Sequence, residues 1–456
     1  MFNAEQNRCL KYCSDLRGHG FFVADAKIIG GIVMETAQVV MVITLLFMVT
    51  GKTPIYLTAI VGSAAAALAA GFPLSGQADV TILKLINGGL NPVIADMTGV
   101  LMFIGIMGKA GFLDVVIRKI MQIGTKVGGA PGITAAGALV AGIIGALTGF
   151  TQPAVTAVVT GPAATKLGMD PNKTAGLAAH AGHFGNFAGF THPTQVAVVA
   201  TAAIGFGMIN VVGAIVGISI IAFSYFRLVR EMKTEGKQLN ETELREVENS
   251  LASQSGIAFK TAILPFILFV LGFVLGYPVF LVGVLCAIFT ALTAKMFMAE
   301  GEAAMLEGVA KIATPLVATI GFLFMSGVMN KIGLVNTISG VLGPVVSASP
   351  VLVMLFVSAI AGFLTQSNAA AVAIVVPFLQ VVLQLGADPL AAACAAAGGS
   401  AVWQYYLTGG PVAALSTVIA VIPGSDLKKA NKFQRPAMVF GFVVLFICVC
   451  IVNFFA

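Results

Sequence analysis

Two short polar stretches interrupt long apolar runs at corresponding places in the sequence. Residues 149–153 read GFTQP and residues 362–368 read GFLTQSN, and each stretch is followed by an apolar run, a glycine and an Asp-Pro pair. Hydroxyl and amide side chains can hydrogen-bond a small anion, and their oxygens can hold Na⁺. The same residue types also join membrane helices to one another, but their occurrence twice at matching places favours a binding role. The candidate binding residues here are Thr151, Gln152, Thr365, Gln366, Ser367 and Asn368.

Two long apolar segments, residues 172–206 and 389–421, each contain a helix-breaking stretch near the middle. In this stretch, the first segment reads GNFAGFTHPTQ and the second reads QYYLTGGPVA. Pro193 and Pro411 each remove a backbone donor and disrupt the preceding turn, so we expect two broken helices. The N-termini of helices at such breaks suit an anion, whereas unwound carbonyls suit Na⁺. The candidate binding residues here are Asn186, Thr191, His192, Thr194, Gln404, Thr408 and Gly409.

Three of the four histidines fall in the first broken segment. His180 and His183 share one helix face because they are three residues apart, whereas His192 directly precedes Pro193 at the break. Imidazole can titrate near physiological pH, so we rank His192 first as a proton carrier and expect His180 and His183 to matter less. All three could instead be hydrogen-bonded helix residues. No metal site is expected, and the candidate residues for a coupling ion are His192, Thr151, Ser367 and Asn368.

Carboxylates are missing from the segments that carry these features. Residues 115–169, 171–230 and 308–387 contain no Asp or Glu. A cationic substrate or a carboxylate-based proton antiporter would need a carboxylate within the membrane. The sequence therefore predicts an anionic ligand held by amides, hydroxyls and helix ends. No cofactor is expected, with Na⁺ open as a coupling ion.

The composition is that of a polytopic helical membrane protein. The chain has 456 residues, of which 58% are hydrophobic and 10% charged, against about 25% charged residues in soluble domains. Apolar runs near the length of a membrane-spanning helix, about 20 residues, recur along it. The net charge of +6 is modest, so no nucleic-acid partner is expected.

The two halves of the chain repeat one another. MGKAGFLDVV at 107–116 matches MNKIGLVNTI at 329–338, and residues 170–193 align without gaps on residues 388–411. Basic residues occur in the loops of the first half but are absent from residues 334–348 and 384–390. Because Lys and Arg mark cytoplasmic loops, the two halves are expected to have opposite orientations, as in an inverted-topology repeat.

We therefore expect an all-α polytopic membrane protein with an inverted-topology repeat, about ten transmembrane helices, two re-entrant hairpins and two broken helices. It would lie in the inner (plasma) membrane. The expected parts are a loose N-terminal extension at 1–27, a first repeat at 28–229 with a hairpin at 130–167 and a broken helix at 172–206, a cytoplasmic linker at 230–259, and a second repeat at 260–456 with a hairpin at 348–386 and a broken helix at 389–421. An ordered cap is the alternative for residues 1–27.

Residues 35–455 resemble the ion transporter superfamily of secondary carriers. The chain is most similar to the anaerobic C4-dicarboxylate carriers and related organic-acid permeases, and more distantly to the divalent anion:sodium symporters. The symporters carry Ser-Asn-Thr at each hairpin tip; Ser367-Asn368-Ala369 keeps two of these residues, and Thr151-Gln152-Pro153 keeps none. The resemblance implies a homodimer in which each protomer has a scaffold and a mobile transport domain that moves like an elevator.

These observations predict a secondary active transporter for a small organic anion, such as a dicarboxylate or hydroxy acid, coupled to H⁺ or Na⁺. The alternative is a cation exchanger similar to Na⁺/H⁺ antiporters, which the missing carboxylates disfavour. An integral-membrane enzyme is not expected, because no catalytic constellation is found. A channel would not need two paired breaks.

Overall fold

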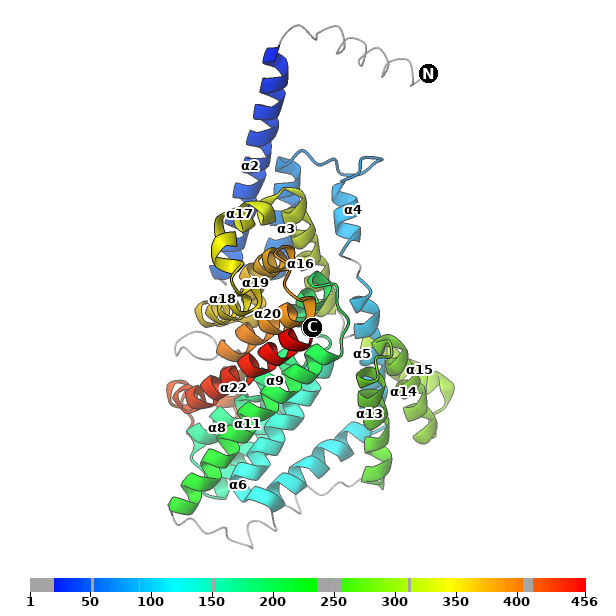
Figure 1. Cartoon of the computed structure of the whole chain (residues 1–456). Coiled ribbons are helices and arrows are strands. Elements are labelled where there is room, and N and C mark those ends of the chain that lie inside the picture. Colours follow the sequence, from blue (N-terminus) through cyan, green and yellow to red (C-terminus); the bar gives the residue numbers. More distant parts are fainter. Residues whose placement is uncertain are drawn as a thin grey trace.

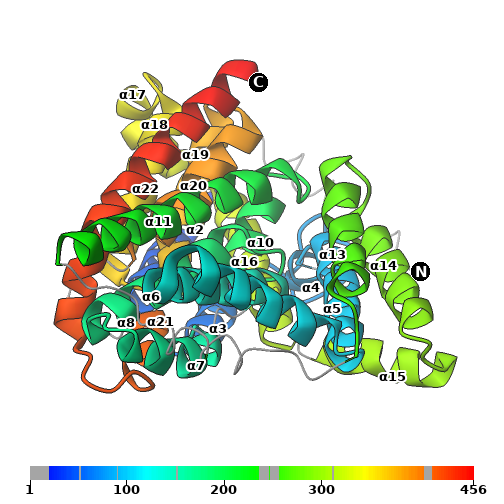
Figure 2. The ribbon, with the colours of Figure 1, turned by 90° about the horizontal axis from the view of Figure 1, so that it is seen from below.

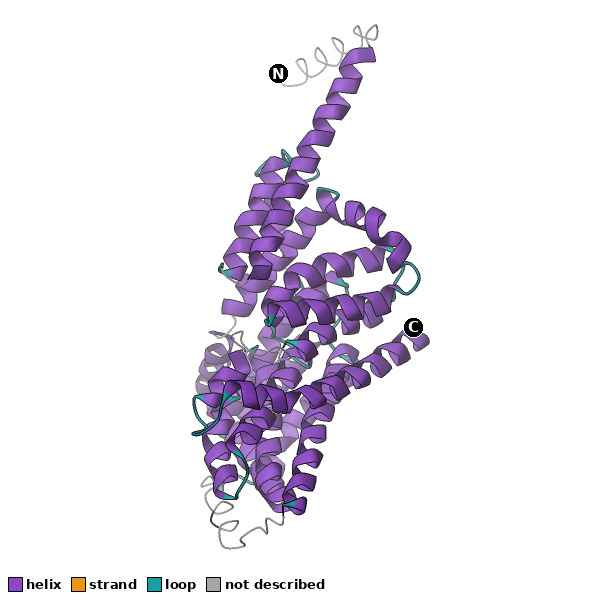
Figure 3. Ribbon diagram, turned by 90° about the vertical axis from the view of Figure 1, so that its left-hand side faces the viewer, coloured by secondary structure: helices purple, strands orange, loops and turns teal. Residues whose placement is uncertain are grey.

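The computed structural model describes residues 20–50, 53–89, 91–149, 153–235, 246, 256–310, 313–404 and 413–456. Within these ranges every regular element is a helix (Figure 3). In the first half the helices are α2 (Gly20–Thr50), α3 (Ile55–Ala69), α4 (Ile82–Asn87), α5 (Val93–Lys109), α6 (Phe112–Thr148), α7 (Ala154–Lys166), α8 (Pro171–Ala179), α9 (Ala181–Phe187), α10 (Pro193–Thr201) and α11 (Met208–Thr234). In the second half they are α13 (Phe259–Val274), α14 (Val279–Thr293), α15 (Met298–Val309), α16 (Ala313–Lys331), α17 (Leu334–Val346), α18 (Pro350–Thr365), α19 (Asn368–Gln384), α20 (Pro389–Trp403), α21 (Ala413–Ile419) and α22 (Leu427–Phe455).

The all-helical fold class predicted from the sequence is confirmed, although the number of full-length spans is smaller than expected. Among the described residues, four helices are long and apolar enough to cross a membrane: α2 from Val33, α6, α11 and α22. A fifth span is possible if α16 and α17, bent by 74°, count together. Several other expected spans are apolar helices of 10–17 residues, shorter than the roughly 20 residues that a straight span needs.

Helix α2 begins earlier than the sequence indicated. It starts at Gly20, so residues 20–27, expected to be loose, are helical; residues 1–19 lie outside the described part. The 37 residues of α6 are two helical stretches joined at Gly129, where φ is 55° and ψ is −129° and the backbone is not helical. The stretch after Gly129 corresponds to the first limb of the hairpin expected at 130–167.

The helices form a central layer and two flanking groups (Figures 1 and 2). One flanking group packs α3 against α2 and α16, and the other packs α14 against α13 and α5. The central layer contains the first broken segment, helices α20 and α21, the paired helices α18–α19, and the long helices α11 and α22. The break expected between α20 and α21, at Pro411, lies outside the described residues. Each flanking group combines helices from both halves of the chain, so neither half folds as a separate body.

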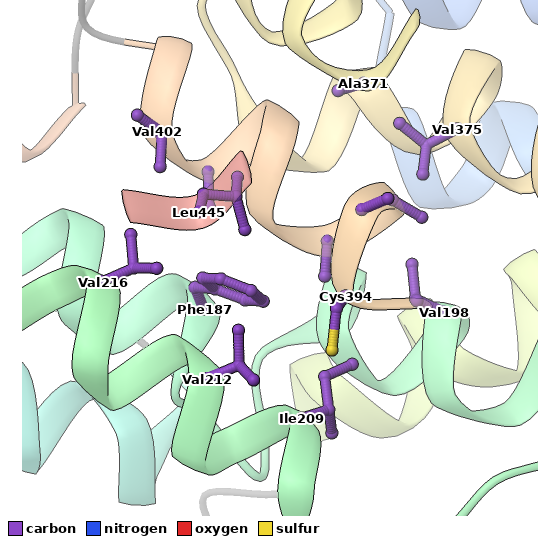
Figure 4. Close-up of a cluster of buried hydrophobic side chains, with 14 of the residues drawn as sticks. Phe187, Val198, Ile209, Val212, Val216, Ala371, Val375, Cys394, Val402 and Leu445 are labelled. Atoms are coloured by element: carbon purple, nitrogen blue, oxygen red, sulfur yellow. The ribbon is translucent and has the colours of Figure 1, made fainter. Parts of the chain in front are cut away.

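The core of the central layer is shared by the two halves (Figure 4). Phe187 from α9 is fully buried among Val212 and Val216 of α11 and Leu445 of α22. A buried aromatic ring makes many van der Waals contacts, each small but large together. This packing fixes α9 in place directly before the break in the first half.

Local conformations recur at matched positions in the two halves. Gly111 before α6 and Gly333 before α17 are both left-handed, each with φ of 73°. Asp170 and Asp388 both cap the following helix through their side chains, and a proline follows each aspartate. The sequence repeat between residues 107–193 and 329–411 is thus matched by equal turns and caps.

Helix α18 lies unusually close to α20. A Cβ placed on Gly399 would stand 2.8 Å from the backbone nitrogen of Ala359, and one on Gly362 would stand 2.6 Å from the carbonyl oxygen of Ser400. Both contacts are shorter than real Cβ contacts allow, so these positions admit only glycine without a shift of one helix.

We expect Gly399→Ala to force α18 away from α20 and to lower the free energy of unfolding by about 1–3 kcal/mol. Gly340→Ala is the matched control, because Gly340 is an exposed residue of α17 with open space around it. Thermal unfolding of both variants in the same detergent measures the difference. Equal stability of the two variants would contradict the close approach.

Candidate functional site

The second polar stretch forms a tight turn between α18 and α19. Helix α18 ends at Thr365, Gln366 adopts the left-handed conformation with φ of 51°, and Ser367 caps α19 by accepting from the Ala370 N–H. The Thr365 hydroxyl donates to the Ala361 carbonyl at 2.8 Å, and the Gln366 amide donates to the Phe363 carbonyl. Most of the polar atoms at this tip are therefore used to build the turn.

Asn368 connects this tip to both broken segments. Its backbone carbonyl accepts a hydrogen bond from the Thr194 hydroxyl of α10 at 3.0 Å, and its side-chain Oδ1 accepts from the Ser400 hydroxyl of α20 at 2.9 Å. Asn368 is 4% exposed, and its Nδ2 has no hydrogen-bond partner among the described residues. The structure thus brings Thr194, Asn368 and Ser400 together and leaves one buried amide donor unused.

The break in the first half spans residues 188–192. Asn210 of α11 donates from Nδ2 to the carbonyls of Ala188 and Gly189, at 3.0 and 3.1 Å. The Phe190 N–H donates to the Ala146 carbonyl of α6 at 2.8 Å, close to the first polar tip. These contacts satisfy backbone groups that the helix no longer pairs, and they take up two carbonyls that could otherwise bind a cation.

Several buried polar atoms around this break lack partners in the described part of the chain. They are Thr191 Oγ1, His192 Nδ1, and both the oxygen and the nitrogen of the Gln195 amide. An unsatisfied buried polar group costs about 1–3 kcal/mol, and native proteins keep few of them. Their concentration within residues 191–195, beside the contact of Thr194 with Asn368, marks a place where a polar ligand can bind.

The remaining predicted residues contribute differently or cannot be placed. Gln404 donates to the Ala401 carbonyl of its own helix at 3.0 Å, and Asn186 is half-buried on α9. The expected positions Thr151, Gln152, Thr408 and Gly409 lie outside the described residues. The described residues contain no group of three His, Cys, Asp or Glu side chains that could hold a metal ion.

Sequence reasoning missed Gln195, Ser400 and Asn210. Gln195 corresponds to Ala413 and Ser400 to Gly182 in the repeat, so the comparison of halves did not select them. A lone serine within the Ala- and Gly-rich helix at 389–403, and a glutamine two residues after Pro193, were the available signals.

Comparison with solved structures places the fold among membrane transporters. MtrF of Neisseria gonorrhoeae, described as one of a class of antimetabolite efflux pumps, matches with a TM-score of 0.58 and 16% identity over 92% of this chain and 95% of its own. The YdaH transporter of Alcanivorax borkumensis, described as having an unusual topology, matches with a TM-score of 0.51 and 13% identity over 92% and 98%. No protein-family model and no curated protein sequence matches the chain. At such identities the likeness shows the fold alone: the chain has the fold of a membrane transporter.

We expect Thr194→Val to destabilise the fold by about 1–3 kcal/mol, because it leaves the buried Asn368 carbonyl without its donor. Thr201→Val, on the same helix, is the control, since the Thr201 hydroxyl has no partner among the described residues. Thermal unfolding in detergent compares the two. A Thr201→Val variant that is destabilised as much as Thr194→Val would argue against the contact.

Proposed function

We propose that this protein is a secondary active transporter of a small organic anion, with the ligand bound between residues 191–195 and Asn368. The unpartnered Asn368 amide nitrogen beside the broken helix is the observation that carries this proposal. It supplies a buried N–H donor where α19 begins, and the positive end of a helix dipole favours an anion there.

The charge of the surroundings supports the sign of the substrate. Neither α10, α19 nor residues 188–192 carries a carboxylate, so nothing at this place would neutralise a bound cation. A carboxylate substrate could accept hydrogen bonds from the amides of Asn368 and Gln195 and from the Thr191 hydroxyl. A Na⁺/H⁺ antiporter-like cation exchanger is the alternative, and it would need acidic groups that these segments lack.

The coupling ion is proposed to be H⁺ or Na⁺. His192 is half-buried directly before α10, with an unpartnered Nδ1 in the described structure. Its ring could hold a proton or bind the anion. For Na⁺, the oxygens of Thr191, Ser367 and Asn368 are the candidates. The Asn368 carbonyl and Oδ1 already accept hydrogen bonds, which weakens the case for sodium.

The proposed mechanism is elevator-type alternating access in a homodimer. The central layer would move as the transport domain against the two flanking groups, which would form the scaffold. The linker at 230–259 is proposed to be cytoplasmic, in an inner membrane. Glu246 of this linker forms a 2.7 Å ion pair with Lys166, the last residue of α7. This pairing lowers the pKa of the Glu246 carboxyl.

Substrate-stimulated counterflow in proteoliposomes tests the carrier directly, because a channel or an enzyme would not exchange one substrate pool for another. A thermal-shift screen of organic acids, with and without Na⁺, would identify the ligand beforehand. A ligand present at a hundred times its dissociation constant stabilises the folded state by about 2.7 kcal/mol. Stabilisation by cations alone, with no organic acid, would favour the exchanger.

We expect Ser367→Asp to abolish anion transport. Aspartate caps a helix as well as serine does, so α19 should still form, but the added negative charge would repel the anion. Ser367→Asn, an equally good and neutral cap, should retain more transport, and Ser347→Asp at an exposed position after α17 should transport normally. Initial uptake rates measure all three, and normal uptake by Ser367→Asp would remove the second tip from the site. Thr151→Asp is the corresponding change at the first tip.

A further inference from the structure

Two buried histidines contact each other outside the candidate binding site. His180, between α8 and α9, and His183 on α9 place their Nδ1 atoms 3.3 Å apart. His180 Nε2 lies 2.8 Å from the Ser224 hydroxyl of α11. Both rings are at most 1% exposed, and the backbone of Val402 in α20 lies against His183. The pair therefore stands where elements of both halves of the chain meet.

The distance between the two Nδ1 atoms limits the number of protons that the pair can hold. One Nδ1 must carry a hydrogen and the other must accept it, because two lone pairs or two N–H groups facing each other would repel. The pair can be neutral, or it can hold one excess proton while keeping the hydrogen bond between the two Nδ1 atoms. A second excess proton would place two cations face to face in a dry interior. The pair thus stores at most one proton beyond its neutral state.

Ser224 fits both of these states. A hydroxyl can donate to a bare imidazole nitrogen or accept from a protonated one. When His180 Nε2 gains a proton, Ser224 therefore changes from donor to acceptor without leaving either group unpaired. A backbone carbonyl or a lysine in the same place would fit only one of the two states.

The surroundings of the pair contain no carboxylate that could neutralise an excess proton. Helix α9 packs against the later limb of α6, against α11 and against α20. Residues 130–148, 208–224 and 389–403 of these helices contain no Asp, Glu, Lys or Arg, and Cys394 is the titratable group on α20. Helix α22, packed on α8 and α11, contributes the basic groups of Lys428, Lys429, Lys432 and Arg435 near its start and the thiols of Cys448 and Cys450 near its end.

The nearest charged residue on α11 is Arg227, three residues after Ser224, and the nearest on α8 is Lys173, seven residues before His180. Lys173 and Glu231 form a 2.7 Å ion pair, seven residues from His180 and Ser224 on the same two helices. Seven residues correspond to about 10 Å along a helix. Arg227 also pairs with Glu231 at 3.0 Å, so this carboxylate is already neutralised. Buried Leu177 and Leu228 occupy the positions between.

We propose that the His180–His183 pair is the site that takes up the coupling proton, one per protomer, together with the anionic substrate. This inference rests on the proposed transport function. An excess charge on the pair has no acidic partner among the described helices packed around it, so a bound anion at residues 191–195 would supply the missing countercharge. Proton and anion would then each raise the affinity for the other, by the same factor. Symport requires this reciprocal effect.

The His180–His183 pair is a better candidate for the site of proton uptake than His192. His192 offers a single ring with an unpartnered nitrogen, which suits a ligand contact. His180 and His183 offer a ready acceptor, a shared hydrogen bond and a hydroxyl that follows the change. Helix α9 also leads directly from the pair into the break at 188–192, so a change in the pair acts on the segment that holds Thr191.

The transport test compares two activities of the same proteoliposomes. His180→Gln and His183→Gln should retain part of their substrate counterflow but lose accumulation driven by a pH gradient. In the wild type the apparent substrate affinity should fall about tenfold per pH unit once the pair loses its proton, and in both variants it should no longer depend on pH. Ser224→Ala should weaken coupling, whereas Ser219→Ala, whose hydroxyl bonds the Ile215 carbonyl of its own helix, should behave as wild type. Accumulation under a pH gradient alone in both histidine variants would overturn the proposal.

A second measurement needs no knowledge of the substrate. The chain has only four histidines, so ¹⁵N-histidine labelling of the whole protein gives a spectrum that single substitutions can assign. A scalar coupling between two Nδ1 nitrogens, lost in His180→Gln, should report the shared proton, and the pair should gain one proton as the pH falls. Absence of that coupling, or of proton uptake, overturns the proposal even if transport is observed. Failure to move any organic acid would instead overturn the proposed function.

Discussion

Breaking a helix inside an apolar interior leaves backbone groups that must find other partners, and the central layer depends on how this is done. At residues 188–192 the partners come from different helices: Asn210 of α11 binds two carbonyls, and the Ala146 carbonyl of α6 accepts from Phe190. Each buried group left alone would cost about 1–3 kcal/mol. The break therefore cannot move independently of α6 and α11, which makes these helices one unit.

The same requirement joins the two halves of the chain. The tip between α18 and α19 meets the first-half break through Thr194 and the second-half helix α20 through Ser400, both at Asn368. The close approach of α18 and α20 at Gly362 and Gly399 keeps this junction in register. The first break, the second tip and α20 are therefore joined through one buried residue.

The sequence predicted the helical class and the position of the second tip and of the first break, because proline and polar residues inside apolar runs are strong local signals. It did not predict Gln195, Ser400 or Asn210. Their importance comes from which helices pack together, and no local pattern records that. The start of α2 at Gly20 was also missed, because residues 1–27 are polar and mixed in sequence.

The division between used and unused polar atoms bears on the sign of the ligand. The carbonyls of Ala188, Gly189 and Asn368 already accept hydrogen bonds, as does the Asn368 side-chain oxygen. Among the described residues, the groups left over include the amide nitrogen of Asn368, both the nitrogen and the oxygen of the Gln195 amide, and the Thr191 hydroxyl. A cation needs oxygen atoms with free lone pairs, whereas a carboxylate needs donors. The carbonyls at the first break and at the second tip thus serve internal hydrogen bonds, whereas the Asn368 amide nitrogen stays free, which is the arrangement that the proposed anionic ligand would need.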